Sequence, residues 1–504
     1  MYRREALKLM GGAPFAFAQP PHFDSNWASI DRRPIPRWWI DAKFGILIVW
    51  GAYSVPAYAP VHTKGETPYS GWYWHSLVEG RNASGPANDG YLTWAFHKRV
   101  YGANFSYFDF APMFRAELFD PGEWMELCAH SGARYVLQAT KHHDGFTLWW
   151  SAEANRSWGR AWNSVDIGPK RDLVAAIRDE GIRRGLRMGI YYSLYEWYNP
   201  LWLSDRRRFV VEHLFPQFKD IVEHAEPSII FADGEWDLTS QQWHSPELLE
   251  WLIKHSSVAR EVVINDRWGK DTRHRHGGYY TTEYTAGMED AKHPWEESRG
   301  IGFSYPYNRM ETLEDYHTGR QLTLMLIDLV SRGGNFLLAI GPTADGRIPV
   351  IMQERLNEIG NWLKLNGEAI YGTRKLPRSR QWSPGIVPTI EEKVFGVAYD
   401  ITQMVDAPPP GYAHIEAFFT AAGDSIYTLL PRRPEKTITL HGFLALESAK
   451  ITLLESGNVL PHRTIGSHLE IDVPDDLQLR FPYRDAYVIK MSGVRTQALD
   501  DQRS

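Results

Sequence analysis

Short runs of continuously apolar residues alternate with amphipathic helical patterns along most of this 504-residue chain. The apolar runs lie at residues 44–50, 135–140, 187–192, 228–232 and 262–265. Helical patterns lie at residues 121–130, 172–184, 206–226 and 246–255. Strands that are apolar throughout are buried on both faces, and helical connections let them pair in parallel. Residues 25–372 are therefore predicted to form an α/β fold, a (β/α)8-like TIM barrel.

The texture of the sequence changes after the helical pattern at residues 352–366. Short alternating runs, punctuated by Pro, Gly and Asp, fill residues 375–495. Such runs are typical of antiparallel strands, so this region is predicted to be a C-terminal antiparallel β-sandwich. None of its sequence features suggests catalysis. The polar tail at residues 497–504 is predicted to be disordered.

The N-terminus has the pattern of an export signal over residues 1–18. Arg3 and Arg4 precede a short apolar stretch, and a small-x-small motif at residues 16–18 follows it. The paired arginines resemble a twin-arginine signal, which predicts an exported protein that is periplasmic or extracellular. The apolar stretch is short and interrupted by glycines and a proline, so an ordinary Sec signal or a misplaced start remains an alternative.

The composition excludes several other classes of protein. The single cysteine, Cys128, allows no intrachain disulfide and no cysteine-based zinc site. A net charge of −6 spread over 504 residues is not the basic footprint of a nucleic-acid-binding protein. No later stretch approaches the ~18 apolar residues of a membrane span. The 21 Trp, 25 Tyr and 22 Phe suit stacking against sugar rings, or simply the core of a large barrel.

Polar residues follow four of the predicted strands. His142 and His143 follow one, Glu196 another, and Asp233 and the pair Asp266-Arg267 two more. In a parallel barrel these positions meet at the C-terminal rim of the strands, where active sites are built. Four consecutive strands that end in this way predict a site at that rim.

Hydrolysis of a glycoside needs two carboxyl groups that flank one bond. Asp233 is the best candidate nucleophile, because it directly follows a buried strand and Gly234 lets the chain turn away. The alternative is an aspartate that caps the next helix. Glu235 and Asp237 are competing carboxylates nearby.

Several ordered blocks resemble the α-L-fucosidase family, glycoside hydrolase family 29. The blocks are a Lys-His-His-Asp-Gly-Phe run at residues 141–146 and segments at residues 44–57, 190–197, 265–269 and 333–346. The resemblance covers roughly residues 35–375 and implies a retaining exo-hydrolase of α-L-fucosides, with a barrel and a β-sandwich and without a metal or cofactor. The expected partner is a small carbohydrate or glycoconjugate substrate.

The resemblance also implies roles for particular residues. Asp233 matches the nucleophile, His142 and His143 would bind sugar hydroxyls, and Arg267 matches the family's arginine. A tyrosine of the third block maps to Tyr191 or Tyr192, with Tyr192 preferred. Two tryptophans and a valine complete the expected sugar contacts: Trp50, Trp72 and Val49. A metal site, the other common use of paired histidines, usually needs a third close ligand.

Two glutamates are candidates for the acid/base. The Thr-Glu-Tyr context of Glu283 is more similar to the family segment that carries the acid, and Glu283 is preferred. Glu296 is the alternative, because Trp295 beside it would desolvate the carboxyl group and raise its pKa, as an acid requires.

Two positions depart from the family pattern. Val49 stands where the family has a histidine that contacts the axial 4-hydroxyl of fucose, and Gly71 stands where it has a glutamate. An unsatisfied buried hydroxyl costs about 1–3 kcal/mol. Three interpretations follow: an α-L-fucosidase in which other groups replace these contacts, an α-L-glycosidase for a sugar that differs at C4 (an α-L-glucoside or quinovoside), or a non-catalytic carbohydrate-binding barrel.

Overall fold

The computed structural model describes residues 24–61, 69–81, 83, 88–390, 392–393, 395–396, 399–475, 477 and 485–497. The predicted export signal at residues 1–18 and residues 498–504 of the predicted tail lie outside this part of the chain.

Eight parallel strands form the central sheet, in the order β5-β4-β3-β2-β1-β8-β7-β6. Their bounds are β1 (Phe44–Ile48), β2 (Tyr135–Lys141), β3 (Arg187–Ser193), β4 (Ile229–Asp233), β5 (Val263–Ile264), β6 (Tyr280–Glu283), β7 (Trp295–Gly300) and β8 (Asn335–Ile340). A single parallel bridge between Asn265 and Tyr279 joins the two edge strands, β5 and β6. The predicted (β/α)8-like barrel is confirmed.

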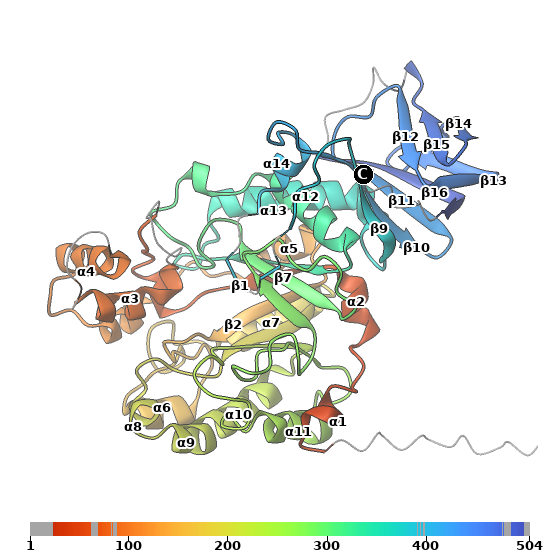
Figure 1. The fold of residues 1–504 in the computed structure, drawn as a ribbon. Coiled ribbons are helices and arrows are strands. Elements are labelled where there is room, and N and C mark those ends of the chain that lie inside the picture. The colour runs from red at the N-terminus through yellow and green to blue at the C-terminus, as the bar shows by residue number, and fades with distance from the viewer. Residues whose placement is uncertain are drawn as a thin grey trace, which may run out of the picture.

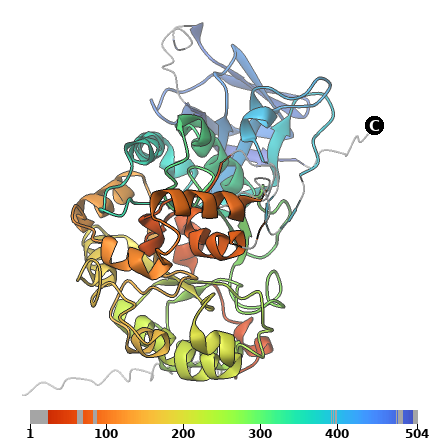
Figure 2. The same ribbon diagram turned by 90° about the vertical axis from the view of Figure 1, so that its left-hand side faces the viewer.

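Helices surround the barrel unevenly (Figure 1). The longer ones are α3 (Tyr73–Gly80), α4 (Asp89–Val100), α5 (Pro121–His130), α7 (Leu173–Arg183), α10 (Phe215–Ala225), α11 (Ser245–His255), α12 (Gly319–Ser331) and α13 (Val350–Asn366). No helix lies between β5 and β6 or between β6 and β7, where all residues are described. Helices α3 and α4 project at one end of the barrel and face the viewer in Figure 2. Because no helix follows β5 or β6, the chain after each of these two strands forms a loop that can carry polar residues.

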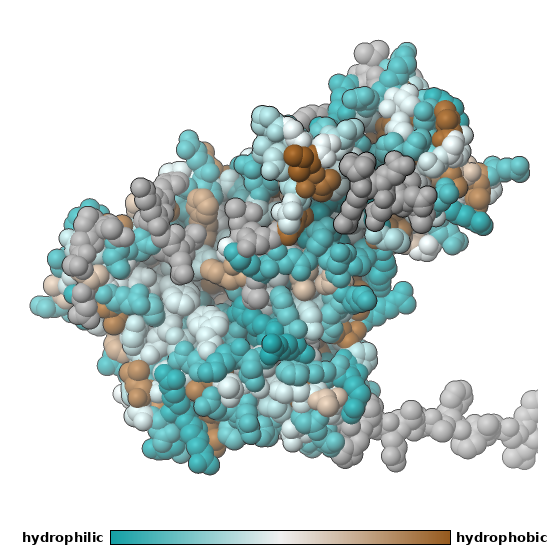
Figure 3. All heavy atoms as spheres, in the orientation of Figure 1, coloured by the Kyte–Doolittle hydropathy of each residue, from teal (hydrophilic) through white to brown (hydrophobic). Residues whose placement is uncertain are grey.

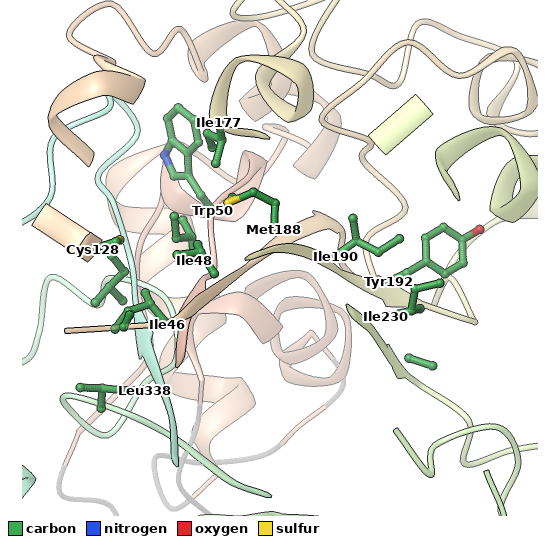
Figure 4. Packing of buried hydrophobic residues seen from close by; sticks show 14 of the residues in the cluster. Ile46, Ile48, Trp50, Cys128, Ile177, Met188, Ile190, Tyr192, Ile230 and Leu338 are labelled. Atoms are coloured by element: carbon green, nitrogen blue, oxygen red, sulfur yellow. The ribbon is translucent and has the colours of Figure 1, made fainter. Parts of the chain in front are cut away.

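Successive side chains along each strand point alternately to the outside and the inside of the barrel. Ile46 and Ile48 of β1 pack outward against the helices, in the cluster that Figure 4 shows. Leu47 and Val49 point inward, into a second buried cluster that includes Tyr191. Both faces are apolar, which explains the continuous apolar runs in the sequence.

A β-sandwich follows the barrel and lies at the upper right of Figure 1. One antiparallel sheet contains β9 (Arg374–Trp382), β10 (Ile415–Ala422), β11 (Ser425–Leu430), β13 (Phe443–Leu453) and β16 (Tyr487–Thr496). The other contains β12 (Thr437–His441), β14 (His462–Ile465) and β15 (His468–Asp472). Side chains from the two sheets share one buried core that includes Phe419 and Leu469. The predicted antiparallel sandwich is confirmed.

The face of the molecule shown in Figure 3 is largely hydrophilic, with hydrophobic residues scattered across it. Among the described residues, no helix combines the length and the apolar character that crossing a lipid bilayer requires.

Candidate active site

A cavity of about 840 Å³ opens at the C-terminal ends of the barrel strands. Seven of the residues predicted for the site line it: Val49, Trp72, His142, His143, Asp233, Arg267 and Glu283. Gly71, the second departure from the family pattern, lines it as well. Ligand sites of barrels are built at this end of the strands, so the cavity is the candidate active site.

Asp233 is the last residue of β4 and its side chain points inward, into the cavity. Its Oδ2 accepts a hydrogen bond of 2.6 Å from the hydroxyl of Tyr191, and its Oδ1 accepts one of 3.0 Å from Nη1 of Arg267. Burial acts to raise the pKa of Asp233, but the positive charges of Arg267 and Arg273 hold this pKa well below its usual range. The carboxylate is therefore charged and held at two oxygens, as a nucleophile requires.

Glu283 is the last residue of β6 and faces Asp233 across Arg267. The same Arg267 nitrogen that contacts Asp233 lies 2.8 Å from Oε2 of Glu283. Because one nitrogen touches both carboxylates, their facing oxygens are separated by at most the sum of 3.0 and 2.8 Å. Two carboxyl groups at this spacing are close enough to act on one bond.

The two adjacent histidines reach the cavity in different settings. Nδ1 of His143 lies 2.6 Å from Oγ of Ser193, and that hydroxyl donates to the carbonyl of Tyr195. The Ser193 hydroxyl already donates its one proton to Tyr195, so Nδ1 of His143 must be the donor in this contact. Burial lowers the pKa of His143 to about 4, so the ring is neutral. Its Nε2, 3.5 Å from Oδ2 of Asp233, is then a hydrogen-bond acceptor at the cavity.

His142 is the less constrained of the pair. Burial is the main cause that lowers the pKa of His142 well below its usual value, and the nearby His143 lowers this pKa further. Its ring stacks on Tyr191 at a centroid distance of 5.7 Å. Nδ1 of His142 is buried and has no hydrogen-bond partner within the described chain.

A buried ion pair supports the loop that carries both histidines. Nζ of Lys141 lies 2.9 Å from Oε1 of Glu196, and neither side chain is exposed. Glu196 also accepts from His213 at 2.6 Å and from Trp158 at 2.9 Å. Gly145 closes the loop at φ 74°, where a Cβ would lie 2.6 Å from Oε2 of Glu196.

Aromatic rings line the mouth of the cavity. The ring of Trp72 lies 5.6 Å from that of Trp236 and 5.7 Å from that of His143, measured between centroids. Trp72 and Trp236 both line the cavity and are partly exposed. Exposed indole faces of this kind provide apolar area against which the C–H faces of a sugar can pack.

Three residues predicted for the site are placed elsewhere: Trp50, Tyr192 and Glu296. Trp50 and Tyr192 point to the outer face of the sheet, where Figure 4 shows them among buried hydrophobic residues. Trp50 donates to the carbonyl of Thr343, and Tyr192 to Oε1 of Gln217. The preference for Tyr192 is therefore corrected to Tyr191, whose hydroxyl reaches Asp233. Neither Trp50 nor Tyr192 contacts the cavity, because each lies one residue out of phase with it.

Glu296 points into the barrel, but it lies too near the N-terminal ends of the strands to reach the cavity. In the β6–β7 register Glu283 pairs with Ser298, whereas Glu296 pairs with Thr281, two residues nearer the N-terminal end. Two residues of strand span roughly 7 Å. Glu296 accepts a hydrogen bond from Tyr135 at the start of β2, and burial raises its pKa to about 7. The alternative acid/base is thus a buried carboxyl of the barrel core.

Sequence reasoning missed several residues that line the cavity. Arg273 lies 2.6 Å from Glu235 and 3.6 Å from Glu283, measured between charged atoms. The Tyr305 hydroxyl contacts the carboxyl group of Glu283. Phe395, which lies between β9 and β10, lines the cavity as well and forms an isolated backbone β-bridge with Glu283. These residues lie in irregular segments, and no sequence period marks them. Only the position of Arg273 six residues after Arg267 hinted at a second cation.

The described part of the chain contains no group of three or more His, Cys, Asp or Glu side chains placed to hold a metal ion. The chemistry available at the cavity is that of paired carboxylates, two guanidinium groups and neutral imidazoles.

The sequence and the fold are similar to those of characterised proteins. The family model of alpha-L-fucosidase matches residues 15–368. The alpha-L-fucosidase of Dictyostelium discoideum is 43% identical over 360 residues, which are 70% of this chain and 74% of that protein. Human tissue alpha-L-fucosidase is 36% identical over 490 residues, 95% of this chain and 94% of that protein. The crystal structure of Thermotoga maritima alpha-fucosidase in complex with a mechanism-based inhibitor superposes with a TM-score of 0.74 at 32% identity, covering 94% of this chain and all of that one.

Proposed function

Because this chain belongs to the alpha-L-fucosidase family and is a glycoside hydrolase, we propose that it is an exo-acting α-L-fucosidase that retains anomeric configuration. The single observation that carries the proposed mechanism is the contact of one Arg267 nitrogen with both Asp233 and Glu283. The two facing oxygens are then less than about 6 Å apart, which supports retention, since inverting enzymes separate their carboxyl groups by ~6.5–9.5 Å to admit a water molecule.

Asp233 is the nucleophile of this mechanism and Glu283 the acid/base. An Asp233 oxygen attacks the anomeric carbon while Glu283 gives its proton to the departing glycosidic oxygen, which forms a glycosyl ester and releases the alcohol. Glu283 then takes a proton from water, and the resulting oxygen nucleophile displaces Asp233 from the anomeric carbon. Two displacements restore the original configuration of the sugar.

The neutral ring of His143 supports binding of the sugar beside the nucleophile. Its Nε2 is an acceptor 3.5 Å from Asp233, so a hydroxyl of the bound ring can donate to it. The hydroxyl of Tyr191 and Nη1 of Arg267 occupy the two oxygens of Asp233 and orient the carboxylate. Trp72 covers one face of the sugar.

The experiment that tests this mechanism follows the first sugar released by ¹H NMR. Hydrolysis of 4-nitrophenyl α-L-fucoside should release the α anomer before mutarotation, and Asp233→Ala should abolish turnover. Asp237→Ala is the matched control, because Asp237 sits on the same loop but is exposed and pairs with Arg206. Initial release of the β anomer, or full activity of Asp233→Ala, would contradict the mechanism.

A second candidate function is suggested by the composition of one cavity wall. Val49 and Gly71 both line the cavity and neither offers a side-chain hydrogen bond. An axial 4-hydroxyl directed at Val49 would lose a hydrogen bond to water without replacement, whereas a sugar that differs at C4 would not. The enzyme would then prefer an α-L-glucoside or α-L-quinovoside.

Parallel assays on the 4-nitrophenyl α-L-fucoside, α-L-glucoside and α-L-rhamnoside separate the candidates. Highest kcat/KM on the fucoside supports the first function, and highest kcat/KM on the glucoside supports the second. Sugar binding without turnover on any substrate would instead favour a carbohydrate-binding barrel. The assembly of Asp233, Glu283 and Arg267 in one cavity speaks against that third interpretation.

We also propose that the protein is exported, on the sequence pattern of residues 1–18 alone. N-terminal sequencing of the protein recovered from the periplasm or medium of the native host tests this: a chain that starts after residue 18 supports export, and an intact cytoplasmic chain contradicts it.

A further inference from the structure

The hydroxyl of Tyr305 touches the carboxyl group of Glu283. Its oxygen lies 3.1 Å from Oε1 of Glu283, 3.0 Å from the backbone carbonyl of Ser298 and 3.1 Å from Oγ of Ser298. Both Tyr305 and Ser298 line the cavity. The proposed acid/base is therefore in contact with a phenol hydroxyl whose other hydrogen-bond contacts in the described chain are both to Ser298.

The ring of Tyr305 is held on two sides. Tyr284 packs against it edge-on at a centroid distance of 4.9 Å, and Tyr69 lies at 5.7 Å. Tyr284 is itself fixed, because its hydroxyl accepts a hydrogen bond of 3.0 Å from the backbone N–H of Gly300. The ring of Tyr305 is therefore held by packing contacts that do not involve the carboxyl group of Glu283.

The two oxygens of Glu283 have different neighbours. Oε2 faces cations, with Nη1 of Arg267 at 2.8 Å and Nη1 of Arg273 at 3.6 Å. Oε1 faces Tyr305. Guanidinium groups donate and never accept, so a proton on Oε2 would face two cations, whereas a proton on Oε1 has an acceptor in the Tyr305 hydroxyl. The neutral acid therefore carries its proton on Oε1, next to the Tyr305 hydroxyl.

A phenol has one proton to donate and lone pairs that accept. When Glu283 is neutral, Tyr305 can donate to the Ser298 carbonyl, which only accepts, and can receive the proton of Oε1. When Glu283 is ionised, Tyr305 can turn its proton to Oε1 while the Ser298 hydroxyl donates to Tyr305. Both arrangements use the same heavy-atom positions, so Glu283 remains hydrogen-bonded whichever charge it carries.

We propose that Tyr305 is a positioning residue that keeps Glu283 in place, and hydrogen-bonded, in both of its protonation states. The inference rests on the proposed role of Glu283 as acid and base. As the glycosidic bond breaks, the proton of Oε1 passes to the leaving oxygen, and the Tyr305 hydroxyl swings its own proton from the Ser298 carbonyl to Oε1. The reverse rotation accompanies removal of a proton from water in the second step.

The test compares two leaving groups with the Tyr305→Phe variant, which keeps the ring. Methyl glycosides need a proton from the acid, whereas 4-nitrophenolate leaves without one. With the α-L-sugar that the wild type hydrolyses, kcat/KM of Tyr305→Phe should fall roughly 10- to 100-fold for the methyl glycoside, as expected for a lost hydrogen bond to a charged group. For the 4-nitrophenyl glycoside it should fall less than about threefold, because little protonation is required.

Tyr284→Phe is the matched control, because it removes the hydroxyl of the neighbouring ring, which does not contact Glu283. It should change both substrates alike. Ser298→Ala offers a second, milder variant: it removes only the hydroxyl that lies 3.1 Å from that of Tyr305 and should show the same leaving-group dependence in smaller measure.

Equal losses on both substrates in Tyr305→Phe, as in Tyr284→Phe, would overturn the inference and leave the proposed function intact. Failure of the proposed function has a different signature. Azide should restore turnover of the 4-nitrophenyl glycoside by Glu283→Ala, and the absence of this rescue would remove Glu283 as acid/base and the role of Tyr305 with it.

Discussion

The hydroxyl of Tyr191 donates a hydrogen bond of 2.6 Å to Oδ2 of Asp233, whereas the next residue, Tyr192, points to the opposite face of β3. Tyr191→Phe should therefore lower kcat/KM roughly 10- to 100-fold, because a hydrogen bond to a charged group is lost. Tyr192→Phe is the matched control and should leave kcat/KM near the wild-type value while it lowers the thermal midpoint. The reverse pattern of kinetics would restore Tyr192 as the tyrosine of the site.

The acidic limb of the pH profile of kcat/KM should shift when a cation beside Asp233 is removed. Arg267 is the largest of the influences that lower the pKa of Asp233, and Arg273 is a smaller one. Arg267→Met should raise this pKa, so the acidic limb of kcat/KM should move to higher pH. Arg273→Met should move it in the same direction by less. An unchanged acidic limb in Arg267→Met would show that Asp233 does not govern it.

Glu296 should affect stability without affecting the chemistry. Burial raises its pKa from 4.5 to about 7, so the folded state favours the neutral form. The resulting stability is fully present below pH ~4.5 and is lost as the pH rises through ~7. Between these values the free energy of unfolding of the wild type should fall, relative to Glu296→Gln, by the order of 1–3 kcal/mol.

Urea titrations of both proteins at pH 4.5 and pH 7.5 measure this difference. Parallel changes in the two proteins would contradict the prediction. Glu296→Gln should also retain most of its activity on the 4-nitrophenyl glycoside, in contrast to Glu283→Ala without azide.

The buried pair of Lys141 and Glu196 should be a large contributor to stability. Lys141→Met leaves a buried carboxylate with one cation fewer, which typically costs about 3–5 kcal/mol in the free energy of unfolding. Arg187→Ala breaks a pair with Glu261 whose side chains are 46% and 65% exposed, and exposed pairs contribute under ~1 kcal/mol. Denaturant unfolding of both variants checks the contrast, and equal losses would refute it.

The preference at C4 of the sugar should depend on Val49. Val49→His places a hydrogen-bonding ring at the cavity wall, so the ratio of kcat/KM for the fucoside to that for the glucoside should rise by roughly tenfold or more. Gly71→Glu should add to this effect. Its Cβ would lie 3.2 Å from Pro306 and 3.5 Å from His142, which a small shift accommodates. A falling ratio would show that Val49 does not face C4.

The strand-end residues of the site were predictable from local sequence. Asp233 lies at the end of a predicted strand, and His142, His143 and Arg267 follow predicted strands closely, whereas Glu283 was preferred from its resemblance to a family segment. Parallel strands in a barrel end at one rim, so a residue at a strand's C-terminal end comes to the cavity whatever the distant packing. The barrel and the sandwich followed in the same way from the periods of apolar residues.

Two features of the side chains could not be predicted in this way: which face of the strand a side chain points to, and at which level along the barrel it lies. Strands that are buried on both faces show no apolar–polar alternation, so the sequence does not distinguish the inward Tyr191 from the outward Tyr192, or Val49 from Trp50. Glu283 and Glu296 both point inward, and only the pairing of β6 with β7 places them at different levels.

The sequence by itself thus determined the alternation of strands and helices, the rim at which the site lies and Asp233 as one carboxylate there, with Glu283 and Glu296 as candidates for the second. The tertiary structure alone decided which of two neighbouring residues faces the cavity, how far the carboxylates are apart, and that Arg273, Tyr305 and Phe395 join them. The physical reason is that the strand ends follow from local patterns, whereas register, barrel closure and loop placement depend on contacts between residues far apart in the chain.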